Sequence, residues 1–525
     1  MRGVRAIVDP CPVTWLGEVG CIFCTDPRLE TSSNVGMRSL EVPSLSFVSR
    51  SSASRWWALA VLALTQLVVV LDTTIVTIAL PQAQTELGLT DGQRQWVVTA
   101  YALAFGALLL LGGRIADYWG RKRTFMVGMI GFGLASAWGG LAQSGTELIV
   151  ARGVQGAFAA MLAPAALAMV TVLFAHGRER NLAFAIFGTV AGTGAAIGLV
   201  LGGVLTEFAS WRWCLLVNVV FVAISMIGGA LLLSESKAEG NNRYDIWGAI
   251  TVTLGLGALV YGFTLAEHGW GSWDTILFLA IGVVLLTVFV VIQSRVRQPL
   301  LPLRVITNSV RAGAFLIQAV IGAVMIGSML YLTFYFQLVL GMSPLISGIA
   351  NVAMTVVVFG CTPFVTKGLN SFGPRPLMIV GPLVTAAGLF LLMGVTPDGN
   401  YFVQVLPALV LMGVGLSMLF VPLQNLALTG VSPADAGVAS ATVNSAFHIG
   451  GSIGLAVFTV LYSTAATDAL AGGADQLLAF TNGYSAAFLA SGIAMVVAAL
   501  IAVFMIRGPR HELIPNGDGA AVPAH

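Results

Sequence analysis

The stretch GGRIADYWGRKR, Gly112–Arg123, separates two long apolar runs and carries four cations and one acid. In membrane proteins, lysine and arginine near the ends of the spans gather on the cytoplasmic side. We therefore expect this stretch to form a cytoplasmic hairpin that fixes the orientation of the chain. Asp117 and Arg121 stand four residues apart, a spacing at which side chains on one helix face can pair.

The composition is that of a membrane protein. Of the 525 residues, 57% are hydrophobic and only 9% are charged, and the mean hydropathy is +0.91. A chain of this composition has too little polar surface to cover a soluble globule. The net charge of +2 gives no reason to expect a nucleic-acid partner.

Apolar runs of about 20 residues, the length that crosses the hydrocarbon core of a bilayer, predict fourteen transmembrane helices. With both termini in the cytoplasm, all but three of the 25 lysines and arginines lie on the side of the hairpin. Arg94 and Arg212 lie on the opposite side, and Arg152 falls within a span. Because cations are biased towards the cytoplasm, this distribution favours the proposed orientation. The predicted spans are 56–80, 96–113, 124–143, 148–174, 182–206, 213–233, 246–266, 275–293, 312–340, 345–366, 376–396, 402–428, 437–462 and 483–506.

An internal similarity predicts a duplicated architecture. WGRKRTFMVG, Trp119–Gly128, aligns with FGPRPLMIVG, Phe372–Gly381, and each stretch opens an apolar span after a turn. Weak self-similarity of this kind marks transporters built from related halves. We therefore expect an all-α integral membrane protein with two six-helix bundles, 55–235 and 311–508, and two inserted helices within 236–310.

The two ends of the chain are predicted to lie outside the membrane. Prolines and acids interrupt residues 1–54, which we interpret as a disordered tail or as the product of a start placed upstream of Met37. Residues 509–525 would form a cytoplasmic tail. CIFC, Cys21–Cys24, has the spacing of a zinc or redox pair, but no second pair accompanies it. We expect no metal site.

Motifs of enzymes and ATP-driven pumps are missing from the sequence. None of the three lysines, Lys122, Lys237 and Lys367, lies in a phosphate-binding GK[ST] loop, and no HExxH occurs. GGSIG, Gly450–Gly454, matches the hydrolase pattern by letter but lies in the middle of a span, without the strand, turn and helix that its chemistry requires. The sequence therefore predicts no enzyme, no nucleotide and no cofactor, with a proton gradient as the energy source.

Several stretches in a fixed order resemble one family. Together with GRIADYWGRKR, they resemble the major facilitator superfamily, and within it the fourteen-span drug/proton antiporter branch. The resemblance covers nearly everything after residue 55 and implies the major-facilitator fold. The matching stretches are LDTTIVTIALP (Leu71–Pro81), LIVARGVQGAFAA (Leu148–Ala160), GLVLGGVL (Gly198–Leu205) and ADAGVASATVNSAFHIGGSIG, which leads into the thirteenth span.

The resemblance assigns roles to the hairpin and to the glycines of the fifth span. In the family, the hairpin latches the two bundles on the cytoplasmic side, whereas its charges alone justify no more than a topology and lipid anchor. In the family, the fifth span is a hinge, and the resemblance implies the same role here. The family's motif usually has Pro where this chain has Leu199. Close helix packing explains the glycines as well. The gate-loop candidates are Gly113, Asp117, Gly120, Arg121 and Lys122, and the packing or hinge candidates are Gly194, Gly198, Gly202 and Gly203.

Asp72 and Arg152 are the charges that lie inside predicted spans. A buried charge in hydrocarbon is costly unless it is paired, hydrated or neutralised, so it indicates function. At 1.5 Å per residue, Asp72 lies about 12 Å and Arg152 about 6 Å from the outer membrane face. The two could form a static pair or a proton-coupling pair, and the resemblance implies coupling. His448, near mid-membrane, is either a second proton-coupling group or a neutral imidazole hydrogen-bonded to Asn444 or a helix carbonyl.

Polar and aromatic side chains within the spans could line a mostly apolar central cavity. Aromatic faces attract cations and lipophilic ligands. The candidates are Gln66, Gln155, Asn218, Gln318, Tyr331, Tyr335, Gln424, Asn425 and Asn444.

The predicted function is proton-coupled export of lipophilic drugs, cationic ones included, by alternating access in the cell membrane. The partners would be small substrates, protons and membrane lipids. The alternative on the same fold is export or flipping of an endogenous lipid or secondary metabolite. A membrane enzyme or passive channel is disfavoured, because no catalytic constellation is present and the halves are duplicated.

Overall fold

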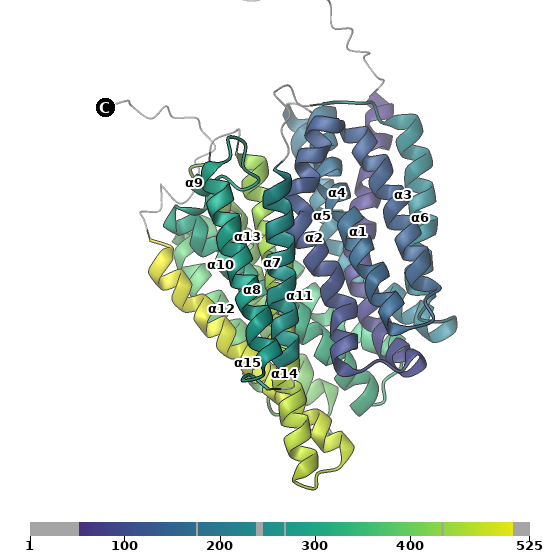
Figure 1. Ribbon diagram of the computed structural model, residues 1–525, viewed down its shortest axis with the longest axis vertical. Helices are drawn as coiled ribbons and strands as arrows, with labels where there is room; N and C mark the ends of the chain where they lie inside the picture. The colour runs from purple at the N-terminus through teal and green to yellow at the C-terminus, as the bar shows by residue number, and fades with distance from the viewer. Residues whose placement is uncertain (1–51, 175–176, 238–244, 267–268, 432–434, 508–525) are drawn as a thin grey trace, which may run out of the picture. The chain divides into compact units, whose positions relative to one another are not determined.

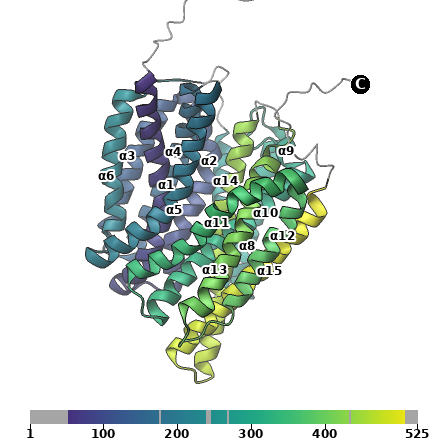
Figure 2. The ribbon, with the colours of Figure 1, turned by 180° about the vertical axis from the view of Figure 1, so that it is seen from behind.

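Long α-helices make up nearly all of the described chain (Figures 1 and 2), as the apolar runs predict. The computed structural model describes residues 52–174, 177–237, 245–266, 269–431 and 435–507, and within these ranges no residue lies in a strand. The predicted N-terminal tail up to residue 51, with its CIFC pair, and the predicted C-terminal tail lie outside the described residues.

The first eight helices follow the predicted spans and extend beyond most of them. Their bounds are α1 (Ser52–Leu87), α2 (Asp91–Trp119), α3 (Arg121–Gly140), α4 (Gly145–Leu173), α5 (Gly177–Phe208), α6 (Trp213–Leu232), α7 (Ile246–Leu265) and α8 (Trp273–Arg295).

The later helices include one short element and two π-helical turns. The short helix is α9 (Leu303–Ile306), and the long helices are α10 (Ser309–Phe334), α11 (Pro344–Phe372), α12 (Pro374–Leu392), α13 (Leu406–Leu428), α14 (Ala436–Ala471) and α15 (Gln476–Met505). One π-helical turn, Tyr335–Val339, extends α10, and the other, Tyr401–Val405, precedes α13.

Thirteen of the described helices are long and apolar enough to cross a membrane. The long helix outside this set is α3, which spans Arg121–Gly140. It begins with three consecutive cations and continues with many glycine and alanine residues, so its mean hydropathy is low for its length. Small residues suit a helix that packs closely on its neighbours, and α3 packs against both α4 and α6.

The helices pack in two sets with matching contacts. In the first set, α2 packs on α4, α1 on α5 and α3 on α6; in the second, α11 packs on α13, α10 on α14 and α12 on α15. The two sets meet where α2 contacts α14 and where α5 contacts α11. Helices α7 and α8 pack on each other, and α7 also contacts α2 and α14. The contacts of one set therefore repeat in the other.

A glycine turn repeats in the two sets as well. Gly120 joins α2 to α3 with φ 128°, and Gly373 joins α11 to α12 with φ 81°. Residues with a side chain rarely adopt these positive φ values, whereas glycine does so at little cost. The two glycines stand at equivalent places in WGRKRTFMVG and FGPRPLMIVG, so the self-similarity of the sequence corresponds to a shared backbone turn.

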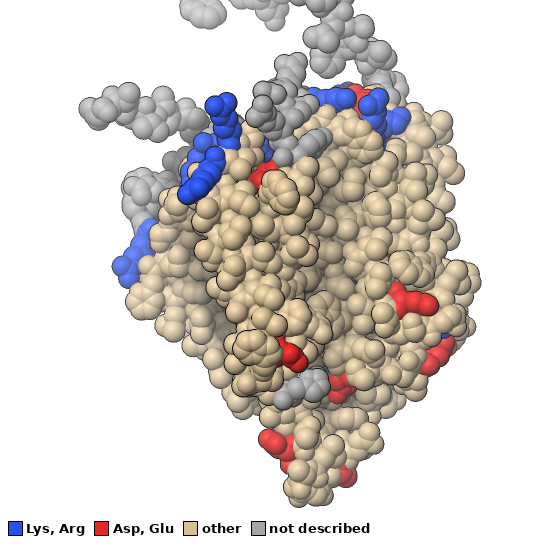
Figure 3. All heavy atoms as spheres, in the orientation of Figure 1, with Lys and Arg blue, Asp and Glu red and all other residues tan. Residues whose placement is uncertain are grey.

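The charged side chains divide between the two ends of the helices. On the side of the molecule seen in Figure 3, Lys and Arg gather at the end where α1 begins, and most of the visible Asp and Glu lie towards the other end. We call the first end the cationic face and the second the opposite face. Ion pairs tie neighbouring helices at the cationic face: Arg55 with Glu179, Arg123 with Glu235 and Arg304 with Asp435.

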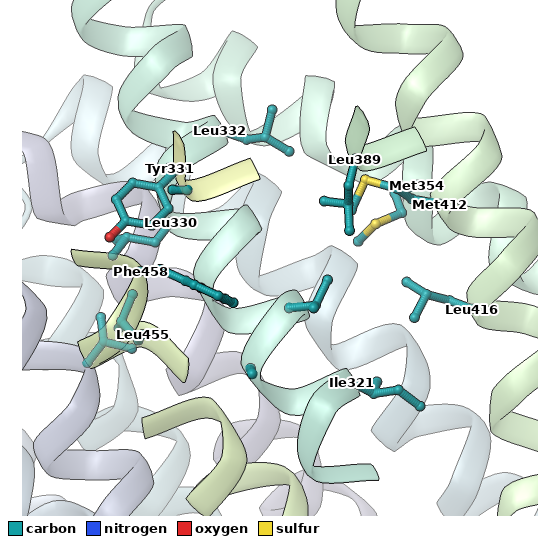
Figure 4. Close-up of a cluster of buried hydrophobic side chains, with 14 of the residues drawn as sticks. Ile321, Leu330, Tyr331, Leu332, Met354, Leu389, Met412, Leu416, Leu455 and Phe458 are labelled. Carbon is teal, nitrogen blue, oxygen red and sulfur yellow. The ribbon is translucent and has the colours of Figure 1, made fainter. Parts of the chain in front are cut away.

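A large apolar core fills the second set. Ile321, Tyr331, Met354, Leu389 and Phe458 come from α10, α11, α12 and α14, and they belong to one cluster of buried side chains (Figure 4). Because most of its side chains are apolar, such a core relies on close packing between helices. The smallest side chains lie where the backbones approach most closely.

The glycines of α5 pack against two different helices. Gly194, Gly198 and Gly202 lie against α1, where a Cβ atom at Gly198 would collide with Thr74 and the carbonyl of Leu71. Gly203 instead lies against α11. A Cβ atom added to Gly203 would lie 2.6 Å from the Cα of Leu345. These glycines therefore allow close approach both within the first set and between the sets.

Gly322 tests the close packing of α10 on α14. A Cβ atom there would collide with the carbonyl oxygen of Phe447, so Gly322→Ala should force the helices apart. We expect the free energy of unfolding to fall by about 1–3 kcal/mol, the range for overpacked cores. Thermal melting of the purified protein measures the change. Gly360→Ala is the matched control, because a Cβ there meets no atom within 4 Å; equal losses at both positions would contradict the packing argument.

Candidate functional site

Asp72 lies at the centre of a buried hydrogen-bond network in the first set. Its side chain is 0% exposed, and Arg152 Nη1 lies 2.6 Å from its Oδ2. Its Oδ1 accepts hydrogen bonds from Gln155 Nε2 at 2.8 Å and Asn218 Nδ2 at 2.7 Å. Both amides also donate to Ser136 Oγ at 3.1 Å. Helices α1, α3, α4 and α6 thus each contribute a polar group to one site.

Arg152 is held on its other sides by α2 and by its own helix. Its Nε donates to the carbonyl of Val97 at 3.3 Å, and its Nη1 donates to Gln155 Oε1 at 2.7 Å. Its guanidinium carbon lies 4.4 Å from the ring centroid of Tyr101. An aromatic face attracts a desolvated cation, so the ring adds to the ion pair. The structure therefore brings together the two intramembrane charges that the sequence singles out.

The arrangement shows what a proton on Asp72 would change. The carboxylate of Asp72 accepts three hydrogen bonds, which suits its charged form. A protonated carboxyl group becomes a donor at one oxygen and loses its charge. Protonation would therefore remove the counter-charge of Arg152 and an acceptor for one of the three donors. The site can couple the protonation of Asp72 to the position of Arg152.

Gln155 and Asn218, which the sequence predicts to line a cavity, belong to this buried network. Their side chains are 1% and 0% exposed, and both bind the carboxylate of Asp72. Ser136, which the sequence analysis did not single out, joins them and donates to the carbonyl of Leu215 at 2.8 Å. A serine in a span gives little signal, since its hydroxyl usually bonds to its own helix.

His448 lies where the two sets meet, between α14 and α2. Its ring centroid lies 4.5 Å from that of Phe105, and a Cβ atom added to Gly106 would be 3.0 Å from its Cβ. Its Nδ1 has no hydrogen-bond partner among the described residues. Of the two partners that the sequence leaves open for a neutral His448, Asn444 is exposed and its Nδ2 donates to the carbonyl of Ser440.

The other cavity candidates divide between the protein interior and its surface. Tyr331 and Tyr335 are buried at 1% and 0% exposure, and their hydroxyls bond to Thr459 Oγ1 and the carbonyl of Thr396. These two tyrosines therefore do not face an open cavity in this conformation. Gln318 is also buried, Gln66 is partly buried, and Gln424 and Asn425 are exposed on α13.

The hairpin between α2 and α3 binds the end of α6. Lys122 Nζ donates to the carbonyls of Ala230 and Leu233 at 2.9 and 2.7 Å. The carboxylate of Glu235 accepts from the backbone N–H groups of Lys122 and Arg123, both at 3.1 Å. An acid at the first turn of a helix satisfies free N–H groups and favours the helix dipole. Glu235 was missed because an acid just after a span resembles an ordinary solvated side chain.

The remaining gate-loop candidates make contacts near the same hairpin. Arg121 Nη2 donates to Asp117 Oδ1 at 3.1 Å, which is the pairing that their spacing allows. Gly113 lies against Pro164 of α4, and a Cβ atom at Gly120 would lie 2.6 Å from Glu235 Oε1. Arg114 Nη2 donates to the carbonyl of Pro299 at 3.4 Å, in the connection after α8. The hairpin thus joins α6 and the segment that follows α8.

Two helix sets with repeated contacts and a buried ion pair define a class of membrane transporter built from related halves. The chain belongs to the Major Facilitator Superfamily, whose family model matches residues 62–455. It is 41% identical over 478 residues to the puromycin resistance protein pur8 of Streptomyces alboniger, an alignment that covers 90% of this chain and 95% of that protein.

Other relatives and solved structures agree with this family. The multidrug efflux pump LfrA of Mycolicibacterium smegmatis is 30% identical, with 79% of this chain and 83% of that protein covered. A bacterial homologue of the human lysosomal transporter Spinster, in an inward-facing conformation, gives a TM-score of 0.62 at 17% identity and covers 86% of this chain and 97% of that one. The chain is therefore a multi-pass membrane transporter of small molecules and not an enzyme.

Glu235 provides a test of the hairpin's anchoring. Glu235→Gln keeps the shape of the side chain but turns an NH₂ group towards backbone donors, so the first turn of α3 should open more often. We expect trypsin to cleave after Arg121–Arg123 about fivefold faster, the factor that corresponds to a helix cap worth about 1 kcal/mol. Gel analysis of timed digests of the purified protein measures the rate.

A second acidic cap supplies the control for this test. Glu147→Gln changes an acid at the start of α4 that binds the backbone N–H of Gln143, beyond the end of α3 that lies farther from the hairpin. Cleavage at the hairpin should be unchanged in this variant. Equal acceleration in both variants, or none in Glu235→Gln, would show that Glu235 does not hold the hairpin.

Proposed function

We propose that the chain is a proton-coupled exporter of lipophilic organic compounds, cationic ones included, that works by alternating access in the cell membrane. The observation that carries the proposal is the buried pair of Asp72 and Arg152, 2.6 Å apart. Charges within the membrane are costly and are usually associated with function. The antibiotic-resistance relatives support export as the direction of transport.

The proposed coupling uses exchange of partners at Asp72. When Asp72 is charged, it holds Arg152, Gln155 and Asn218. A proton on Asp72 neutralises the carboxylate, so Asp72 no longer needs Arg152 as its counter-ion. Arg152 then keeps Gln155 Oε1 and the carbonyl of Val97 as acceptors. Because both protonation states leave the arginine with partners, the two states can be close in energy. Substrate movement would be linked to this exchange, with His448 as a second group where the sets meet.

We further propose fourteen spans with both termini in the cytoplasm and halves at 55–235 and 311–508. The matched contacts of the two helix sets and the shared glycine turns at Gly120 and Gly373 support this division. The gathering of cations at one end of the helices supports its assignment as the cytoplasmic face. Helices α7 and α8 would be the insertion within 236–310.

The hairpin after α2 would control the cytoplasmic side. Its anchoring on α6 through Lys122 and Glu235 gives it a fixed position in the first set. Asp117 and Arg121 then stand where the second set could bind or release them as the halves rock. Lipid anchoring by the same cations is compatible with this role.

A second candidate substrate is an antibiotic-like metabolite made by the cell itself. Two relatives favour it: the cephamycin export protein CmcT of Amycolatopsis lactamdurans and the tetracenomycin C resistance and export protein of Streptomyces glaucescens, which are 39% and 32% identical. A transporter for such a compound would need the same apolar path and the same proton pair. The two candidates differ in the identity of the cargo and not in mechanism.

Transport in proteoliposomes under an imposed pH gradient tests the coupling, with puromycin as the probe. We expect Asp72→Asn to abolish gradient-driven accumulation, because the amide cannot exchange a proton, but to retain puromycin exchange without a gradient. Asp274→Asn, at an exposed position at the start of α8, should transport as the native protein does. Gradient-driven accumulation by Asp72→Asn at the native rate would overturn coupling through this residue.

Proton release provides an independent measurement. Puromycin added to the purified protein in weakly buffered detergent solution should release protons if substrate and proton compete for the carrier. The release should vanish in Asp72→Asn and persist in Asp274→Asn. A puromycin-dependent release that is unchanged in Asp72→Asn would place the proton site elsewhere.

A further inference from the structure

The side chain of Arg94, from the first helix set, contacts the second helix set at the opposite face. It lies in the first turn of α2, and its side chain is only 3% exposed. Its guanidinium carbon lies 4.4 Å from the ring centroid of Phe334 on α10 and 5.3 Å from that of Tyr462 on α14. A cation of one half is therefore held by aromatic rings of the other half.

The guanidinium group depends on these rings, because its hydrogen bonds are incomplete. Nη1 lies 3.0 Å from Asp91 Oδ1 and 3.4 Å from Gln84 Oε1, both in the first set. Nε and Nη2 are buried and have no hydrogen-bond partner among the described residues. Burying such donors is unfavourable unless something replaces water. The negative faces of the aromatic rings are the groups placed to do so.

The tyrosine rings of the second set form a cluster through contacts with one another. Tyr462 stacks with Tyr331 and Tyr484 at centroid distances of 5.6 and 5.2 Å. The hydroxyl of Tyr331 lies 2.8 Å from Thr459 Oγ1, which fixes its orientation. We call Tyr331, Phe334, Tyr462 and Tyr484 the aromatic cage. All four belong to α10, α14 or α15, so the cage moves as part of the second set.

Arg212 is a comparable arginine whose contacts named below all lie on the side of the first set. It lies at the same face, with its guanidinium carbon 4.6 Å from the ring centroid of Trp211 and its Nη2 2.9 Å from Glu86 Oε1. It also donates to the carbonyls of Gly140 and Ala142. All of these partners belong to the first set or to its connections. Arg94 and Arg212 are also the two cations that the sequence places on the side opposite the hairpin.

We propose that the aromatic cage is a cation-binding site whose resident ligand is Arg94, and that this contact latches the two halves together at the opposite face. The proposal rests on the alternating-access cycle proposed above. Two hydrogen bonds also join the halves at this face, from Gln337 Nε2 to the carbonyl of Ile78 and from Leu345 N to Glu207 Oε2, both at 3.0 Å. Water replaces such bonds readily when the halves part.

The latch is suited to repeated opening. When the halves part, the two donors without partners, Nε and Nη2, gain water, which compensates for the lost rings. Asp91 moves with Arg94 because both lie on α2, so the arginine keeps its ion pair throughout. The contact therefore favours the closed state without making it permanent.

Electron-spin distance measurements between the halves test the latch without any transport assay. Nitroxide labels at Phe208→Cys and Phe402→Cys would report the distance between the halves. Phe208 ends α5, and Phe402 lies in the π-helical turn before α13; their side chains are 73% and 72% exposed. The background would lack the five native cysteines. Arg94→Gln and Phe334→Leu should each raise the ratio of separated to closed molecules by about tenfold, the scale of a desolvated cation–π contact.

The controls separate the latch from general loosening and from the proposed transport function. Arg212→Gln should leave the distance distribution unchanged, and the double variant of Arg94→Gln with Phe334→Leu should open no further than either single variant. An unchanged distribution in Arg94→Gln, equal opening in Arg212→Gln, or additive effects in the double variant would overturn the latch. Puromycin transport by the native protein would stand in each of those cases, so failure of the latch and failure of the transport proposal are distinguishable.

Discussion

A carboxylate in the interior of a membrane protein must find donors within the protein, and this requirement organises the first helix set. Asp72 obtains three, from Arg152, Gln155 and Asn218, on two different helices. Those helices must then lie close to α1, and Ser136 of α3 links the two amides. Because a buried charge without partners is far more costly than a lost apolar contact, the network constrains the arrangement of helices more strongly than the surrounding packing does.

Helix α2 connects this network to the boundary between the sets. The carbonyl of Val97 and the ring of Tyr101 hold Arg152 on one side of the helix. Arg94, one turn before Val97, reaches the aromatic cage, and Gly106 allows His448 of α14 to approach on another side. In the proposed cycle, the same helix therefore contacts the group that changes partners on protonation and the second half of the molecule.

The pairing of Asp72 with Arg152 could be predicted because it depends on depth, which residue counting supplies. The positions of Gln155 and Asn218 could not, since a span that is apolar on all sides gives no indication of which way a polar residue faces. Glu235 follows its span directly, and only the fold shows that it caps a helix more than a hundred residues earlier in the chain. The aromatic cage needs α10, α14 and α15 to meet α2. The helices and the pairing of Asp72 with Arg152 were therefore readable from the sequence, whereas orientation about each helix axis was not.

Arg94 and Arg152 respond differently when the halves separate. The polar partners of Arg152 all lie in the first set, so the halves can part without breaking its bonds, and its own state changes only with Asp72. Arg94 divides its contacts between an acid on its own helix and rings on the other half. Parting the halves therefore disturbs Arg94 and leaves Arg152 in place. In the proposed cycle, Arg152 would respond to a proton and Arg94 would hold one face closed, so the two arginines would act on different steps.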